Sequence, residues 1–331
     1  ASHYAADSEV LLAFPSISTL SSTITSAPLR PVAQDFRSST LRSLINQFRF
    51  LRDNRVRLMY MSDWDTWNLR YIFYRLGGVR RIVVHDHTPG ERTRPRGVKR
   101  LLKLAVNRVP GLAADGAIGA SEYVRERLEN VSCFPARKCF AAPNGVPPRN
   151  GVEELAAVPI RQLLGVPEDR MLMVMTGRAS RYKNVQFAIE CMAKVLQARR
   201  TDLQFVFVGD GPDLSLFKAQ AVERNLGEWC SFIGQRADVP RILRECDFAF
   251  HPSKGEVGYS LSILEYMQAG LPVIVPDNPS VCGATRHRET GLIFKEGSVE
   301  SAVEAICIML DEPVDRIRMG RFAAKVIERE F

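Results

Sequence analysis

The stretch "CDFAFHPSKGEVGYSLSILEYMQAGLPVIVPD", residues 246–277, decides the fold class of this chain. It opens with an apolar run at 247–252, passes through a Gly-Tyr-Ser turn at 258–260 into a helical pattern, and returns to an apolar run at 271–277. Two buried strands joined by a helix form a parallel pair, because the crossover helix carries the chain back to the same end of the sheet. The stretch therefore predicts a strand–helix–strand unit of an α/β protein.

The helix in this stretch is apolar on nearly every side, and Glu265 lies within its first turns. Burying a carboxylate without a partner is costly. We therefore expect Glu265 to lie in or near a core, with some group present to hydrogen-bond it.

The same alternation extends through the second half of the chain. Apolar runs at 170–176, 203–208 and 230–234 alternate with helical patterns such as the one at 184–199. Continuous runs of β-branched and aromatic residues that alternate with helices are typical of a parallel sheet covered on both faces. The second half therefore predicts one Rossmann-like domain.

The first half predicts another domain of the same kind, although less clearly. Its apolar runs, each followed by a turn or a helical pattern, cover 56–61, 80–85 and 116–121. The stretch at 138–148 is rich in proline and Asn-Gly and is the best candidate for a linker. A length of 331 residues favours roughly two domains. We predict an α/β protein with domains at 1–148 and 149–331.

The composition is that of an ordinary globular protein, with 46% hydrophobic and 25% charged residues. No run approaches the roughly 20 apolar residues of a membrane span, and no secretory signal pattern opens the chain. The seven cysteines are scattered and lack zinc-ligand spacing, which predicts reduced thiols. We expect a cytoplasmic protein, and both ends indicate a piece of a longer polypeptide.

The stretch at 92–108 carries seven basic residues and no acidic one, and its leucines give it one apolar side. Two interpretations stay open. The stretch is a solvated basic face, or it contacts phosphates or an anionic membrane at the inner surface of the cell. Nucleic acid is not expected as a partner, because the stretch offers almost no aromatic side chains for base stacking.

Polar candidates in the second half follow the apolar runs directly. Arg178 and Lys183 follow the run at 170–176, and Gly209 follows the run at 203–208. Because parallel strands end at the same edge of a sheet, these groups can converge on one crevice.

The turn at 258–260 begins a helix and adds free backbone N–H groups to that crevice, so that together with the two basic side chains it predicts a diphosphate site. At the same rim, Glu265 could accept hydrogen bonds from vicinal hydroxyls, as acidic residues do from ribose.

The motifs "TGRASRYKN", "FVFVGDGPD", "FIGQRADVPRIL" and "TGLIF" accompany the opening stretch. In order and spacing they resemble the retaining, nucleotide-sugar-dependent GT-B glycosyltransferases of family 4, the glycosyl transferases group 1. In the first half, "VVHDH", "IGASEYVRERL" and "APNGV" are similar to that family's amino-terminal domain and hinge. The resemblance covers about residues 56–331 and is most specific across 170–294.

This resemblance implies two Rossmann-like domains that face each other across a cleft, the first binding an acceptor and the second a nucleotide sugar. It implies a retaining transferase that moves a hexose from a UDP- or GDP-linked donor to a glycan or lipid-linked acceptor. Such enzymes act in polysaccharide or glycolipid biosynthesis. Neither a metal nor a cofactor is expected, since the basic pair would neutralise the diphosphate.

The resemblance also assigns roles to residues. It implies donor binding by Arg178, Lys183, Gly209, Gly258, Tyr259, Ser260, Leu261 and Glu265. It implies that His85 or His87 lies near the transferred sugar, and that Glu256 takes part in catalysis.

One departure from the family pattern concerns its pair of glutamates, which usually have seven residues between them. Here Glu256 and Glu265 have eight, and Val257 falls where the first glutamate belongs. Either Glu256 reaches the sugar through a one-residue bulge, or it is an ordinary surface acid. The second case leads to an alternative function, a catalytically degenerate scaffold that binds a nucleotide sugar or a glycan.

Overall fold

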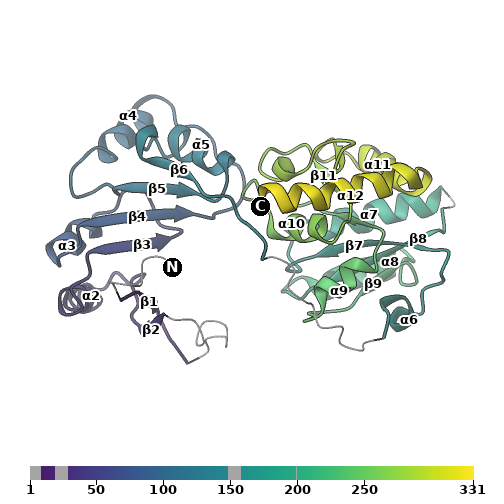
Figure 1. The fold of residues 1–331 in the computed structure, drawn as a ribbon, viewed down its shortest axis with the longest axis horizontal. Helices are drawn as coiled ribbons and strands as arrows, with labels where there is room; N and C mark the ends of the chain where they lie inside the picture. Colours follow the sequence, from purple (N-terminus) through teal and green to yellow (C-terminus); the bar gives the residue numbers. More distant parts are fainter. Residues whose placement is uncertain (1–8, 19–28, 148–157, 199) are drawn as a thin grey trace. The chain divides into compact units, whose positions relative to one another are not determined.

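The computed structural model describes residues 9–18, 29–147, 158–198 and 200–331 (Figure 1). The chain divides into two compact units. The first comprises Ala1–His85, Pro95–Ala117 and Ser132–Cys139, and the second Asp86–Arg94, Ile118–Val131 and Phe140–Phe331. The predicted domain boundary between 148 and 149 lies outside the described residues, so those two domain ranges stay a prediction.

A six-stranded sheet forms the centre of the second unit. Its strands are β7 (Met171–Thr176), β8 (Leu203–Val208), β9 (Cys230–Phe232), β10 (Phe248–Phe250), β11 (Val273–Pro276) and β12 (Gly291–Phe294). The spatial order is β12-β11-β10-β7-β8-β9, and every neighbouring pair is parallel. The parallel sheet predicted for the second half is confirmed.

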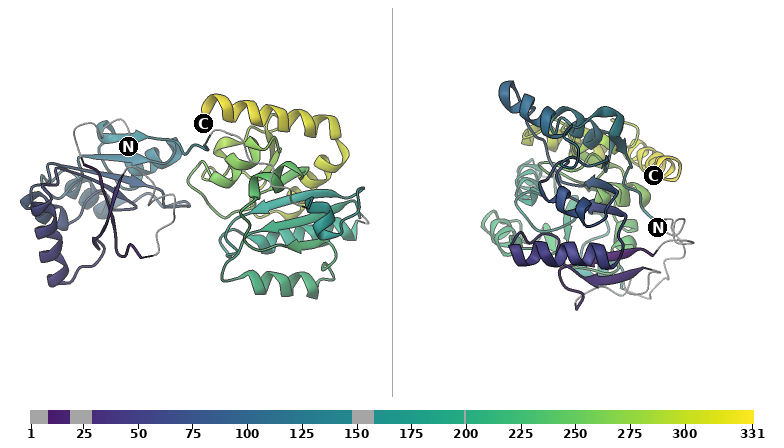
Figure 2. Two further views of the ribbon diagram at one scale, coloured as in Figure 1. Left: turned by 60° about the horizontal axis from the view of Figure 1, so that its bottom comes forward. Right: turned by 90° about the vertical axis from the view of Figure 1, so that its left-hand side faces the viewer.

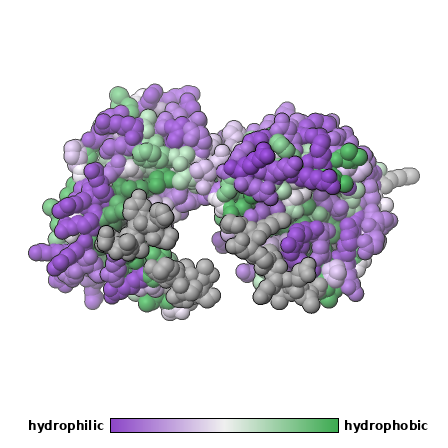
Figure 3. All heavy atoms as spheres, viewed as in Figure 1, coloured by the Kyte–Doolittle hydropathy of each residue, from purple (hydrophilic) through white to green (hydrophobic). Residues whose placement is uncertain are grey.

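Helices cover both faces of this sheet, as Figure 2 shows. They are α6 (Ile160–Leu164), α7 (Val185–Gln197), α8 (Leu214–Glu223), α9 (Val239–Arg244), α10 (Leu261–Gln268), α11 (Val299–Asp311) and α12 (Pro313–Glu330). Successive strand residues point to opposite faces. Met173 and Phe205 accordingly pack with α7, α8 and α11, whereas Leu172 and Val206 pack with α9, α10 and α12. The outer side of α12 is hydrophilic (Figure 3).

A second sheet has the order β3-β4-β5-β6, and its first two strands are parallel. The strands are β3 (Leu58–Ser62), β4 (Arg81–Asp86), β5 (Gly116–Gly119) and β6 (Cys139–Ala141). The helices of this part of the chain are α2 (Leu41–Asp53), α3 (Arg70–Leu76), α4 (Gly97–Val106) and α5 (Glu122–Asn130). A separate parallel pair comprises β1 (Leu11–Phe14) and β2 (Arg30–Ala33).

Local signals set several helix ends. Ser121 precedes α5, and its Oγ accepts a hydrogen bond from the amide of Val124 at 3.1 Å, which satisfies one of the free N–H groups at the helix start. The helix α8 ends before Gly227, because Asn225 adopts a left-handed conformation with φ of 58°. Among the described residues, no helix has the length and apolar character needed to cross a bilayer.

Candidate functional site

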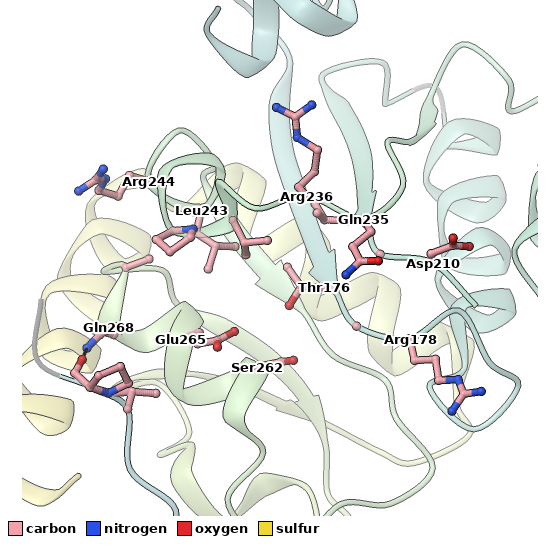
Figure 4. Close-up of a pocket in the computed structure, with 18 residues that line it drawn as sticks. Thr176, Arg178, Asp210, Gln235, Arg236, Leu243, Arg244, Ser262, Glu265 and Gln268 are labelled. Atoms are coloured by element: carbon pink, nitrogen blue, oxygen red, sulfur yellow. Dashed lines mark hydrogen bonds between the residues drawn. The ribbon is translucent and has the colours of Figure 1, made fainter. Parts of the chain in front are cut away.

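A pocket of about 630 Å³ lies in the second unit, beyond the carboxyl ends of β7 and β8 (Figure 4). Its lining residues are Val146, Pro147, Thr176, Gly177, Arg178, Val208, Gly209, Asp210, Gln235, Arg236, Val239, Pro240, Leu243, Arg244, Ser262, Glu265, Gln268 and Ala269. Parallel sheets bind ligands at this edge, and a pocket of this size can enclose a small organic molecule.

Two glycines at the strand ends form part of the pocket wall. Gly177 and Gly209 have φ angles of 145° and 150°, which side-chain-bearing residues rarely adopt. A Cβ atom on Gly209 would lie 1.9 Å from the carbonyl oxygen of Gly177. The two strand ends approach each other this closely only because Gly209 lacks a side chain.

The helix α10 supplies the polar side of the pocket. Ser262, Glu265 and Gln268 follow one another at intervals of three residues and all line the pocket, while the other faces of α10 are buried. The expectation that this helix is apolar on nearly every side was wrong, because a spacing of three places these residues on one face.

Glu265 does not lie in a core. Its side chain is exposed on the pocket wall, and its carboxylate has no hydrogen bond or ion pair with another described residue. Figure 4 shows it directed into the pocket near Thr176. Desolvation by the surrounding protein raises the pKa of Glu265 above its ordinary value. The carboxylate is therefore accessible to the hydroxyl groups of a ligand.

Arg178 follows β7 and lies at one edge of the pocket (Figure 4). Its guanidinium has no hydrogen bond or ion pair with another described residue. Ser260 precedes α10 without making a side-chain cap, so the first amides of this helix are available as donors. A guanidinium and a helix start at one site are suited to an anion.

Lys183 does not line the pocket. A Cβ atom on Gly177 would lie 3.8 Å from the Lys183 Cε, so the lysine stem passes close to the pocket wall. The Lys183 ammonium forms an ion pair with the Glu256 carboxylate. The two side chains are 20% and 9% exposed, so the pair is largely withdrawn from solvent.

Glu256 lies in a buried cluster, and its interpretation as an ordinary surface acid was wrong. The same carboxylate oxygen that contacts Lys183 lies 2.9 Å from Nε2 of the fully buried His251. Burial raises the pKa of Glu256, but the hydrogen bonds from His251 and Lys183 and the positive charge beside the carboxylate outweigh burial and lower the pKa to about 2. Burial lowers the pKa of His251, so at neutral pH its ring is neutral and Nε2–H donates to the carboxylate. Whether Glu256 reaches a sugar stays a prediction.

The turn before α10 is held by Ser280. The amide of Gly258 donates to the Ser280 carbonyl at 2.7 Å, so this amide is engaged within the protein, and the donor-binding role of Gly258 stays a prediction. The amide of Glu256 donates to Ser280 Oγ at 3.2 Å. Val257, which stands at the family's glutamate position, is 8% exposed. Tyr259, Ser260 and Leu261 do not line the pocket, so their donor-binding role stays a prediction.

The two predicted histidines lie at the end of β4. His85 is its penultimate residue and contacts the hydroxyl of Tyr60, and His87 follows the strand directly. Neither residue lines the pocket of the second unit. A role of either histidine near a transferred sugar stays a prediction.

Several pocket residues were not predicted, above all Gln235, Arg236 and Arg244. The first two follow β9, so the strand-end argument that identified Arg178 would have found them as well. Arg236 is held by two hydrogen bonds to Asp238, at 2.8 and 2.9 Å. Arg244 ends α9 and is exposed, and its place at the pocket follows only from the packing of that helix.

The fold and the pocket together define a class, the α/β proteins with an open pocket at the edge of a parallel sheet. A family model for "Glycosyl transferases group 1" matches residues 159–326. The chain therefore belongs to the glycosyl transferases group 1. The match covers the six-stranded sheet, its helices up to residue 326 in α12, and all but two residues of the pocket.

Curated relatives agree with this assignment. The chain is 25% identical over 292 residues to a UDP-Gal:alpha-D-GlcNAc-diphosphoundecaprenol alpha-1,3-galactosyltransferase of Escherichia coli, covering 87% of this chain and 75% of that protein. It is 27% identical to an alpha-monoglucosyldiacylglycerol synthase of Streptococcus pneumoniae over 64% of this chain. There the chain spans less than half of the relative, 47% of its length.

Solved structures of similar proteins identify the fold of this chain. A glycosyltransferase from Rickettsia africae matches with a TM-score of 0.79 at 12% identity, over 98% of this chain and 86% of that one. The structure of Anabaena Alr3699/HepE in complex with UDP matches with a TM-score of 0.69 at 17% identity, over 88% and 78%. The fold is GT-B, as the resemblance implied. The narrower assignment to family 4 stays a prediction.

Proposed function

We propose that this chain is a retaining glycosyltransferase that moves a hexose from a UDP-linked donor to a lipid-linked or glycan acceptor. One observation carries the proposal: a single pocket joins the Glu265 carboxylate, the Arg178 guanidinium and Ser262 in the uncapped first turn of α10. A nucleoside diphosphate needs these three groups, because its ribose hydroxyls donate to a carboxylate and its phosphates accept from cations and amides.

We propose UDP rather than GDP as the nucleotide of the donor, because several of the similar proteins are named for UDP or a UDP-linked sugar. One solved structure is named as a complex with UDP, another as a complex with UDP-glucose, and the E. coli relative is named for UDP-Gal. The names of the E. coli and S. pneumoniae relatives contain a diphosphoundecaprenol and a diacylglycerol. Acceptors of that kind support a cytoplasmic enzyme working at the inner membrane surface.

The proposed reaction uses no metal. Arg178 and Lys183 are two cations separated by four residues. Arg178 lies at the pocket edge and the Lys183 stem passes close to the pocket wall, so that the two can neutralise the diphosphate as it leaves. For this, Lys183 must share its ammonium between Glu256 and a phosphate oxygen, which its three N–H donors allow. Turnover of donor should then be unchanged by EDTA, and its loss on chelation would contradict this part of the proposal.

The test of the site is calorimetric titration of UDP and GDP into the chain and into Glu265→Ala. We expect UDP to bind, and we expect binding to weaken about tenfold or more in the variant, because a hydrogen-bonded charged group is lost. Glu304→Ala is a suitable control, since Glu304 is exposed on α11 and does not line the pocket. Equal weakening by both substitutions, or no binding of either nucleotide, would reject the proposed site.

The alternative is a scaffold that binds the nucleotide sugar without turning it over. Two residues support this alternative. Val257 has no carboxylate, and the Glu256 carboxylate already forms an ion pair with Lys183 and a hydrogen bond with His251. The discriminating experiment measures hydrolysis or transfer of UDP-hexose by the wild type and by Glu256→Gln. Turnover that disappears in the variant while UDP binding remains would exclude the scaffold. Binding without turnover in both proteins would establish it.

A further inference from the structure

The helix α4 has no buried residue along its ten residues. Val98, Leu101 and Leu102 are 72%, 66% and 61% exposed. An amphipathic helix on a globular protein normally turns its apolar stripe toward the core. In α4 these three large apolar side chains instead remain in solvent, whereas Leu104 and Val106 are half-buried.

The orientation of α4 is set by the residue that ends it. Asn107 is 1% exposed. Its side-chain amide nitrogen Nδ2 donates to the carbonyl of Ser132 at 2.8 Å, and its side-chain oxygen Oδ1 accepts from the Thr66 hydroxyl at 2.7 Å. At about 100° per residue, Asn107 lies on the side of the helix opposite the stripe formed by Val98, Leu101, Leu102 and Ala105. These hydrogen bonds therefore direct the stripe away from the protein.

Basic side chains flank the outward stripe. At about 100° per residue, Lys99 lies on one border of the stripe and Arg108, just beyond the end of α4, lies on the other, and both are exposed. The exposed Arg100 lies on the side of Asn107 instead. No acidic residue occurs between 92 and 114. Figure 3 shows hydrophobic and hydrophilic side chains next to each other over α4. An outward apolar stripe with positive charge on either side matches the boundary between acyl chains and anionic headgroups.

We propose that α4 docks this chain on an anionic lipid bilayer. Val98, Leu101 and Leu102 enter the boundary between headgroups and acyl chains, and the flanking Lys and Arg side chains reach the lipid phosphates with their long stems lying along the apolar surface. The surface selects a bilayer rather than free phosphate, because a soluble anion would leave the apolar stripe in water. This proposal does not depend on the reaction, since vesicle binding and donor turnover are measured separately.

The first experiment is flotation of the protein with vesicles of phosphatidylcholine alone and of phosphatidylcholine mixed with phosphatidylglycerol. We expect binding to the anionic vesicles only, weakening as salt is added. Lys99→Gln/Arg108→Gln should lower the affinity about 25-fold, since each basic residue near such a surface contributes about fivefold. Leu101→Ser/Leu102→Ser should lower it about tenfold or more, because two apolar side chains no longer enter the interface.

Matched controls separate docking from a general loss of charge or of apolar surface. Arg42→Gln/Arg49→Gln removes two exposed charges of α2 in the same unit. Val222→Ser removes an apolar side chain of α8 that is 67% exposed. Both control proteins should bind as the wild type does. Equal loss in the controls, or equal binding to both kinds of vesicle, would overturn the proposal.

A second copy of the chain is the competing occupant of this stripe. Sedimentation velocity without lipid distinguishes the two cases. A monomer that floats with anionic vesicles supports membrane docking. A dimer that Leu101→Ser/Leu102→Ser converts to a monomer, together with no vesicle binding by the wild type, would overturn it.

Discussion

Glu256 is a residue for which the sequence left two interpretations open. Next to Val257 and in a polar turn, it had the pattern of either a catalytic acid or a surface acid. In the structure its carboxylate forms an ion pair with Lys183 and a hydrogen bond with His251, and its side chain is 9% exposed. A carboxylate is stable at such a site only because a cation and a hydrogen-bond donor both reach it.

This cluster predicts strong coupling between Lys183 and Glu256. Lys183→Met should lower the free energy of unfolding by roughly 3–5 kcal/mol, since it leaves a buried carboxylate without its cation. Lys183→Met/Glu256→Gln should recover much of that loss. Urea denaturation of the wild type, the two single variants and the double variant gives the coupling energy.

The exposed pair Arg318–Asp315 provides the control for this cycle. Its side chains are 56% and 42% exposed, so Arg318→Met should cost less than about 1 kcal/mol. Losses that simply add in the Lys183/Glu256 cycle would show that the two residues act independently.

Glu256 also predicts a dependence of stability on pH. Its pKa falls from 4.5 to about 2 on folding, so its ionised form stabilises the fold above pH 4.5 and that stabilisation is lost as the pH falls toward 2. Glu256→Gln should therefore differ most from the wild type near neutral pH, by about 3 kcal/mol. The difference should shrink between pH 4.5 and 2 in denaturation measured across that range, and a constant difference would contradict the assignment.

At the scale of elements, the close contact between the ends of β7 and β8 gives a prediction about packing. Gly209→Ala should lower the free energy of unfolding by roughly 2–4 kcal/mol, because its Cβ would meet the Gly177 carbonyl oxygen at 1.9 Å. It should also reduce UDP binding, because the pocket wall must move.

Gly227→Ala is the matched control, since no atom lies within 4 Å of the added Cβ and its φ is not positive. This change should be neutral or stabilising by up to about 1 kcal/mol. Equal effects of the two substitutions in urea denaturation would show that the contact at Gly209 carries no strain.

Elements were predicted unevenly along the chain. Five of the six strands of the second-unit sheet followed from continuous apolar runs, β8 with its observed bounds, 203–208, whereas β12 was not predicted as a strand. The helix α2 was not predicted, although Thr40 caps it by accepting from the Ser43 amide at 3.3 Å. Its buried Gln47 hides the helical pattern, because a glutamine counts as polar in sequence. In the structure its amide donates to the carbonyls of Asp35 and Ser38, at 3.0 Å each.

At the scale of the whole molecule, the two compact units predict two unfolding transitions. The pocket and both faces of the six-stranded sheet belong to the second unit. If the proposed donor site is correct, UDP at one hundred times its Kd should stabilise that unit alone, by about 2.7 kcal/mol. Differential scanning calorimetry should then show one transition that moves and one that does not.

Glu265→Ala serves as the control in this experiment, because it should remove the shift and leave both transitions in place. A single transition that moves as a whole with UDP would contradict the independence of the two units. Two transitions whose temperatures are both unchanged by UDP would instead contradict the proposed nucleotide site.

By itself, the sequence determined the parallel sheet, the family and the position of Arg178, Gly209 and Glu265 at the edge of that sheet. Continuous apolar runs and strand-end turns are local patterns, and parallel strands place whatever follows them at one edge. These predictions therefore needed no knowledge of long-range packing.

Only the tertiary structure decided which polar groups are accessible. It exposed Glu265 on the pocket wall, buried Glu256 between Lys183 and His251, and turned the apolar stripe of α4 outward through Asn107. The physical reason is that burial and pairing depend on side chains far apart along the chain. Residue 107 is hydrogen-bonded to residues 66 and 132, and residue 256 to residue 183. A local sequence pattern cannot predict contacts between residues this far apart.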